Sequence, residues 1–183
     1  MLEQLSNIYE LHRTLCTAFP ANRDPERILF RVEDGKESHI VIVQSKGLPD
    51  WSRVNEKDDY FIEPPEHKPF TPKVANGQAL VFRIRSNPTV KKDGKRLGLI
   101  KSDDQLEWLN RKAKAGGFDL VQLQVVPAGI VNAKKAGATL SFYSVTFQGA
   151  LKVVDKDKFI ETLANGIGSG KGMGFGLLSV ARV

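Results

Sequence analysis

Tyr9 and His12 are the side chains whose types and spacing best suit proton transfer. They stand three positions apart in a stretch predicted to be helical, so both project from one side of the helix, His12 at the margin of its apolar stripe and Tyr9 just outside it. An imidazole titrates near pH ~6.5 and can give or take a proton, whereas a tyrosine, near ~10, is better suited to orienting a substrate. Arg13 adds a fork of donors for a phosphate. Metal-free RNA cleavage needs little more than such a set; the alternative is two ordinary residues at a helix rim.

A glycine-rich string near the C-terminus is the second candidate. Residues 166–176 alternate glycine with other residues, and Lys171 is their one charged side chain. Clustered backbone N–H groups beside a lysine bind phosphate, so a site is predicted at Gly168, Ser169, Gly170 and Lys171. The string fits neither the P-loop nor G-x-G-x-x-G, and a predicted strand follows it instead of a helix. It therefore suits a phosphate backbone better than a free nucleotide, and an exposed tight turn is the alternative.

The positive charge of the chain is concentrated in one segment. The net charge is +6, and the sequence pI is about 9.4. Residues 83–101 carry this whole excess, because their one acid, Asp93, stands among Arg83, Arg85, Lys91, Lys92, Lys95, Arg96 and Lys101. Such a concentration favours an anionic partner, above all a nucleic acid. A solvated lysine loop is the alternative.

Several classes of protein are excluded by what the sequence lacks. Cys16 is the single cysteine and the three histidines are far apart, so no zinc-ligand spacing and no internal disulfide is expected. A reducing cytoplasm is the simplest location. No apolar run is long enough for a membrane span, and no signal peptide is visible. We expect no metal, no cofactor and no membrane partner.

Hydrophobic periodicity predicts the elements that position these residues. Helices are predicted over residues 5–19, 102–115 and 156–165. Strands are predicted over residues 27–33, 39–45, 79–85, 97–101, 118–126, 139–154 and 175–182. Between them lie a long loop (46–78), a basic linker (86–96) and a hairpin tip (127–138) that carries Lys134 and Lys135. Capping boxes are predicted at Asn7–Glu10, with Ser6 as the other candidate cap, and at Ser102–Gln105.

The order of these elements predicts the fold class. The second half reads βαββαβ, which is the ferredoxin-like unit, and the first half has the same order without its opening strand. We predict an α+β fold of two tandem ferredoxin-like (RRM-like) domains, at residues 1–87 and 88–183, the second carrying the glycine string. A single irregular α+β domain is the alternative.

Motifs along almost the whole chain resemble one family. The stretch Asn7-Ile-Tyr-Glu-Leu-His-Arg-Thr-Leu15 resembles the start of the CasE-type endoribonucleases of type I-E CRISPR systems. Residues 166–181 resemble their glycine-rich loop, which is followed by Gly-Leu-Leu-Ser. Between these, similar motifs occur in the same order at Phe82–Pro88, Lys95-Arg96, Trp108-Leu109 and Phe147–Gly149.

The resemblance implies a function and roles for residues. It implies a metal-independent endoribonuclease of the prokaryotic cytoplasm that binds a CRISPR repeat hairpin and cuts at the base of the stem. The products are a mature crRNA with a 2′,3′-cyclic phosphate and a 5′-OH, and the enzyme stays bound as a subunit of Cascade. His12 is then the general acid or base and Tyr9 its helper, while Lys171 and the glycine string hold phosphates and Lys134 and Lys135 lie on a hairpin that enters the RNA major groove. The remaining predicted RNA-binding residues are Arg13, Arg83, Arg85, Lys91, Lys92, Lys95 and Arg96.

The chain departs from the pattern of this family at one point, and two alternative functions remain. The family usually opens with a short strand before the first helix, and this chain begins after it, so either its start is truncated or wrongly assigned, or the first sheet is one strand short. A scaffold that binds hairpin RNA without cutting it is the first alternative function. A nucleotide-using enzyme built on the glycine string is the second, and the unmatched nucleotide motifs disfavour it.

Overall fold

A four-stranded antiparallel sheet is built from strands that are distant in sequence. The computed structural model describes residues 7–20, 28–35, 38–54, 61–135 and 137–183. The sheet has the order β6-β7-β3-β8, so β3 lies between β7 and β8. Its elements in chain order are β3 (Ala79–Ser86), α3 (Ser102–Ala115), β6 (Phe118–Lys135), β7 (Ala138–Val153), α4 (Lys156–Asn165) and β8 (Leu178–Arg182). This order and this pairing are those of a ferredoxin-like unit.

The core lies between one face of this sheet and the two helices. Along β3, Leu80, Phe82 and Ile84 are buried and alternate with more exposed side chains, as in a strand with one packed face. They join one core cluster with Trp108 of α3 and Phe159 of α4. The helices predicted at 102–115 and 156–165 are confirmed.

Strand β3 corrects the predicted topology. Residues 79–86 form a strand as expected, but they pair with β7 and β8 and so open the second unit, although we predicted them to close the first. The predicted opening strand at 97–101 is wrong. Residues 86–96 are not a linker either, because a separate hairpin forms from β4 (Thr89–Lys92) and β5 (Lys95–Gly98). We therefore propose that the units divide before Ala79 instead of at residue 87.

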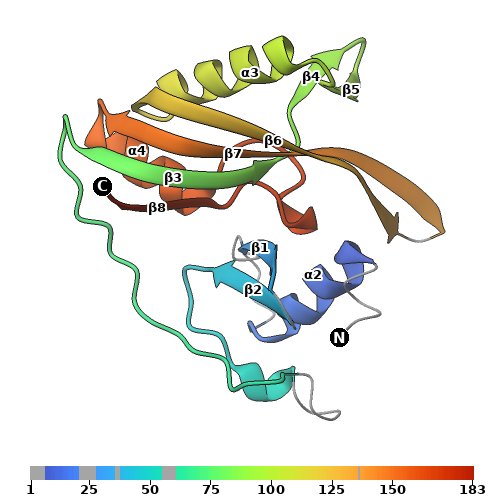
Figure 1. Cartoon of the computed structure of the whole chain (residues 1–183). Coiled ribbons are helices and arrows are strands. Elements are labelled where there is room, and N and C mark those ends of the chain that lie inside the picture. The colour runs from blue at the N-terminus through green and yellow to red at the C-terminus, as the bar shows by residue number, and fades with distance from the viewer. Residues whose placement is uncertain (1–6, 21–27, 36–37, 55–60, 136) are drawn as a thin grey trace.

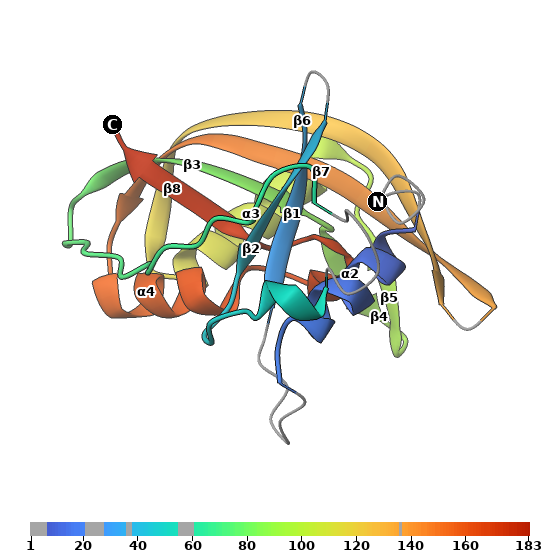
Figure 2. The same cartoon turned by 90° about the horizontal axis from the view of Figure 1, so that it is seen from below.

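The strands β6 and β7 extend well beyond the sheet as a two-stranded ribbon (Figures 1 and 2). We predicted that β6 would end at residue 126 and that 127–138 would be a hairpin tip. In the structure, pairing continues through an irregularity between Pro127 and Gly129 as far as Lys135 and Ala138. A β-bulge of this kind lets a strand bend and continue, so a proline that suggests a strand end is tolerated here.

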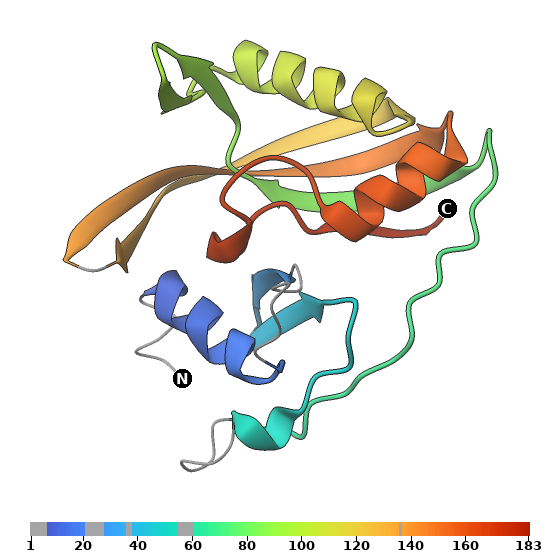
Figure 3. The same ribbon diagram turned by 180° about the vertical axis from the view of Figure 1, so that it is seen from behind.

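A smaller unit lies on the other side of the sheet from α3 (Figures 1 and 3). It consists of α2 (Ile8–Thr17), the antiparallel pair β1 (Leu29–Asp34) and β2 (His39–Gln44), and the short helix η1 (Trp51–Arg53). Ile8, Leu11 and Leu15 form the apolar stripe of α2 and pack with Phe30 of β1. The predicted helix and both strands are thus confirmed where the structure describes them. Leu5 and Ser6 lie outside the described residues.

Both predicted capping boxes are wrong, for the same reason. Asn7 is the N-cap of α2, the predicted position, but its side chain makes no cap bond: it accepts a hydrogen bond from the N–H of Lys134 (3.0 Å) and donates one to the carbonyl of Lys134 (3.3 Å). Lys101, not Ser102, is the N-cap of α3, and the amide of Gln105 donates to the carbonyls of Leu99 (2.9 Å) and Ile100 (3.1 Å). In each case the side chain expected to complete the capping box bonds instead to backbone groups outside the helix.

A buried arginine joins the two units. Arg31 of β1 is 3% exposed; its Nε donates to Glu33 (2.6 Å), while its terminal nitrogens donate to Ser179 Oγ (3.0 Å) and the carbonyl of Leu177 (3.1 Å). Glu33 also accepts from Arg83 of β3 at 3.1 Å. These bonds tie β1 to the open face of the larger sheet.

Removing Glu33 tests this connection. Glu33→Ala leaves the Arg31 guanidinium buried without its carboxylate, and we expect the free energy of unfolding to fall by about 3 kcal/mol. Asp34→Ala is the matched control, because Asp34 is 90% exposed and its pairing with His39 is at the surface, where such pairs contribute at most about 1 kcal/mol. Urea unfolding of both variants gives the comparison, and equal losses would contradict the role of Arg31.

Candidate active site

The imidazole of His12 lies where the first helix meets the glycine string. It is half-buried and stacks on the ring of Phe30, with centroids 5.9 Å apart and planes 7° from parallel. A Cβ added to Gly172 would stand 3.1 Å from Nε2 of His12, which is tighter than ordinary contact. Glycine at 172 thus leaves room for the imidazole. The structure brings together the two motifs that the sequence singled out at opposite ends of the chain.

The surroundings of His12 disfavour its protonated form. Burial lowers the pKa of the imidazole below its usual 6.5, and the positive charge of Lys135 lowers that pKa further. Cys16 Sγ lies 3.8 Å from Nδ1 and 3.7 Å from Nε2, so it is aligned with neither nitrogen alone. At neutral pH the ring is therefore largely neutral and able to accept a proton.

Lys135, at the tip of the ribbon, contacts the ring of Tyr9 and also acts on His12 through its charge. Its Nζ lies 5.3 Å from the centroid of the Tyr9 ring, within the range of a cation–π contact. The backbone of the neighbouring Lys134 is held by Asn7, as described above, so the ribbon tip is fixed against the first turn of α2. A proton acceptor, a phenol and a cation thus share one place.

The glycine string is organised mainly by packing. It continues from α4 through η2 (Lys171–Met173) to β8. Gly168 lies against Trp108, and Ser169 bonds both the carbonyl of Asn87 (3.4 Å) and the hydroxyl of Thr89 (3.2 Å). Gly170 lies against the rings of Phe142 and Phe175. These contacts give a structural reason for the glycines that the sequence assigned to phosphate binding.

Three of the predicted arginines are engaged within the protein. Arg83 bonds Glu33 and Gln148, and Arg13 bonds Glu10 at 3.1 Å near the surface. Arg85 is half-buried: its Nε donates to Ser144 Oγ (2.8 Å), and its guanidinium lies 5.7 Å from the centroid of the Phe175 ring. Burial lowers the pKa of Arg85, while nearby acids oppose that shift.

The basic residues of the β4–β5 hairpin are exposed. Lys91, Lys92, Lys95 and Arg96 project from it into solvent, and the hydroxyl contact between Thr89 and Ser169 attaches the base of the hairpin to the glycine string. They form a surface beside the string and are not part of the cluster around His12.

Two contacts of the site, made by Phe30 and Asn7, escaped sequence reasoning. Phe30, which stacks on His12, looks like any inward residue of a predicted strand. Asn7 was identified, but as a local cap. No pattern along the chain shows that either contacts a residue far away in sequence, so only the folded structure reveals them.

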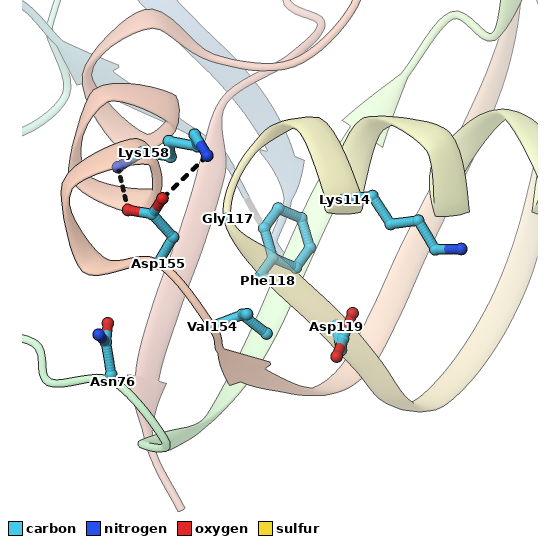
Figure 4. Close-up of a pocket in the computed structure, with 8 residues that line it drawn as sticks. All are labelled: Asn76, Lys114, Gly117, Phe118, Asp119, Val154, Asp155 and Lys158. Atoms are coloured by element: carbon cyan, nitrogen blue, oxygen red, sulfur yellow. Dashed lines mark hydrogen bonds and ion pairs between the residues drawn. The ribbon is translucent and has the colours of Figure 1, made fainter.

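A pocket of about 450 Å³ lies away from these residues, beside the N-terminus of α4 (Figure 4). Phe118 and Asn76 contribute to its wall, and at its rim Asp155 is paired with Lys158 at 3.0 Å. None of the predicted site residues lines it. Across the described ranges, no three His, Cys, Asp or Glu side chains are grouped so that they could hold a metal ion, and no described helix is long and apolar enough to span a membrane.

Comparison with known proteins places the chain in a family. The family described as CRISPR associated protein matches residues 2–182. The chain is 37% identical to the CRISPR-associated endoribonuclease Cse3 of Thermus thermophilus, over 97% of this chain and 91% of the relative. It belongs to the CasE/Cse3 family of CRISPR-associated endoribonucleases.

Further members of the CasE/Cse3 family agree with this assignment. The CRISPR system Cascade subunit CasE of Escherichia coli is 32% identical over 96% of this chain and 92% of the relative. The structure of Thermus thermophilus Cse3 bound to an RNA representing a pre-cleavage complex matches with a TM-score of 0.90 and 36% identity, over 99% of this chain and 92% of that one. The predicted family and the tandem ferredoxin-like fold are thereby confirmed.

The pKa of His12 is open to direct measurement. In an NMR pH titration we expect the His12 resonance to titrate below 6.5, because burial and Lys135 both disfavour the imidazolium. Lys135→Gln removes one of these two causes, so the pKa of His12 should rise while His39 and His67 serve as internal references. An unchanged or lower pKa in the variant would show that Lys135 does not act on the imidazole.

The packing role of Gly168 is tested against Gly77. Both have a positive φ (+83° and +84°), but a Cβ at Gly168 would lie 2.9 Å from Trp108, whereas one at Gly77 would meet nothing within 4 Å. Gly77→Ala should cost about 1–2 kcal/mol of stability through backbone strain alone. Gly168→Ala should cost roughly 1–3 kcal/mol more through overpacking, as measured by thermal unfolding. Equal costs would mean that Trp108 moves aside freely.

Proposed function

We propose that this protein binds a CRISPR repeat hairpin and cleaves it at the base of the stem without a metal ion. The products are a crRNA with a 2′,3′-cyclic phosphate and a 5′-OH, and the protein then stays bound as a Cascade subunit. One observation carries the proposal: α2, the ribbon tip and the glycine string bring His12, Tyr9 and Lys135 together at Gly172. The names of the relatives, an endoribonuclease with bound RNA and a Cascade subunit, support it.

In this proposal His12 acts first as a base. Its lowered pKa keeps the imidazole neutral near pH 7, so it can accept the proton of the 2′-hydroxyl as that oxygen attacks the adjacent phosphorus. The resulting imidazolium can return the proton to the leaving 5′-oxygen. Lys135 stabilises the charge that develops on the phosphorane, and Tyr9, held beneath Lys135, orients the ribose.

The basic surfaces hold the RNA around this centre. We assign phosphate contacts to Lys171 and the glycine string (Gly168, Ser169 and Gly170), to Lys134 and to basic residues of the β4–β5 hairpin. Arg13, Arg83 and Arg85 also belong to the proposed interface, although the pairing of Arg83 with Glu33 gives it a structural role as well. The substrate is a transcript, so we propose the prokaryotic cytoplasm as the location.

The competing function is a scaffold that binds hairpin RNA without cutting it. The stacking of His12 on Phe30 is the observation in its favour, since a packed histidine can be purely structural. Binding alone therefore does not distinguish the two functions, and cleavage does.

Cleavage of a labelled repeat hairpin in EDTA tests the reaction. We expect cutting in EDTA, and none when the nucleotide at the cleavage position carries a 2′-deoxy ribose, because the attacking oxygen is then missing. Cutting of the deoxy RNA would exclude the 2′-hydroxyl mechanism.

Substitution of His12 separates catalysis from binding. His12→Ala should lower the single-turnover cleavage rate about 10²- to 10⁴-fold, the usual contribution of a general base, while hairpin binding survives. His39→Ala is the matched control, because His39 lies at the surface beside Asp34. In the wild-type chain the rate should fall as the pH drops through the pKa of His12, below 6.5. Equal rates in the two variants would favour the scaffold.

A further inference from the structure

The β4–β5 hairpin has two chemically different faces. Side chains alternate along a strand, and directly paired residues share a face. The register therefore places Thr89, Lys91, Arg96 and Gly98 together on what we call the Lys91 face. The other, the Lys92 face, holds Val90, Lys92, Lys95 and Leu97. The basic residues that the sequence treats as one loop thus divide into two pairs.

Two independent contacts show where the Lys91 face points. Thr89 Oγ1 lies 3.2 Å from Ser169 Oγ, so this face meets the glycine string. A Cβ on Gly98 would lie 3.6 Å from Cβ of Tyr143, an ordinary contact, so the same face also meets β7. The Lys92 face points away from both.

The ribbon offers a matching face. Tyr143 pairs with Ile130, and the same alternation places Asn132 and Lys134 on the Tyr143 side. Ala133 and Phe142 belong to the opposite side, which packs with α2, and Lys135 shares that side. Lys134 and Lys135 therefore point to opposite faces of the ribbon, which runs between α2 and the β4–β5 hairpin (Figures 1 and 3).

The charges on this side of the ribbon lack counter-ions. Lys91, Arg96 and Lys134 are exposed, and over the ranges that the structure describes none of the three forms an ion pair. Cations gathered from two elements repel one another unless an anion lies among them. The Thr89–Ser169 contact makes this surface continuous with the glycine string, which reaches His12 through Gly172. An RNA strand that reaches His12 can therefore continue onto the surface that carries Lys91, Arg96 and Lys134.

We propose that Lys91, Arg96 and Lys134 form a phosphate-binding site for the backbone of the RNA stem, on the side of the ribbon opposite to His12. Lys92 and Lys95 lie outside this site. The inference rests on the proposed function and deepens it, because it specifies which of the basic residues engage the RNA and from which side.

A pair of double variants with the same change in charge tests the division. Lys91→Gln/Arg96→Gln and Lys92→Gln/Lys95→Gln each remove two charges from the same two strands. We measure the Kd for a repeat hairpin with a 2′-deoxy at the cleavage position, by fluorescence anisotropy at several salt concentrations. The first pair should lower the slope of log K against log salt by about 1.4–1.8, which corresponds to two lost phosphate contacts. The second pair should lower it by less than half as much.

A single variant and a folding control complete the test. Lys134→Gln should lower the slope by about 0.7–0.9, the value for one phosphate contact. The thermal unfolding curves of both double variants should coincide, since all four side chains are exposed. Equal slopes for the two double variants, or a larger loss in the Lys92 pair, would overturn the inference while leaving the proposed function intact if the wild-type chain binds and cuts. A wild-type chain that does not bind the hairpin would overturn the proposed function itself.

Discussion

The buried guanidinium of Arg31 is the contact on which the geometry of the site depends. It lies between the two units, and its partners come from β1 itself, from β8 and from the segment just before β8. Phe30, the preceding residue on β1, supports the imidazole of His12. The position of His12 relative to the glycine string thus follows from how β1 is held against the sheet. Because a buried charge requires all of its partners, this contact tolerates little displacement.

The ribbon adds a second constraint, which is the alternation of side chains along a strand. One strand carries Lys135 toward α2 and Lys134 toward the hairpin, so adjacent lysines serve different surfaces. The same rule divides the basic hairpin. Charge counts along the sequence cannot show this division, because it depends on the pairing register.

Sequence reasoning succeeded where the signal is local and failed where partners are distant. The helices at 102–115 and 156–165 follow from periodicity. The assignment of β3 to the sheet of the second unit does not follow from periodicity, because an alternating pattern of residues does not show with which strands it will pair. The Asp93-Gly94 turn, with φ of 49° and 75°, is a hairpin signal that was present in the sequence and overlooked. Tyr9 and His12 stay predictions from type, spacing and resemblance, whereas the contacts of His12 with Phe30 and Gly172 and the effect of Lys135 on its pKa depend on the folded chain.

The contact of His12 with Gly172 has a consequence for biosynthesis. Helix α2 leaves the ribosome early, whereas the glycine string and β8, which supplies Ser179 to Arg31, follow every other described element. Domains form during synthesis from the N-terminal side, so α2 must wait for partners that are translated much later. In a nascent chain the imidazole of His12 therefore lacks its contact with Gly172 until translation has passed the glycine string.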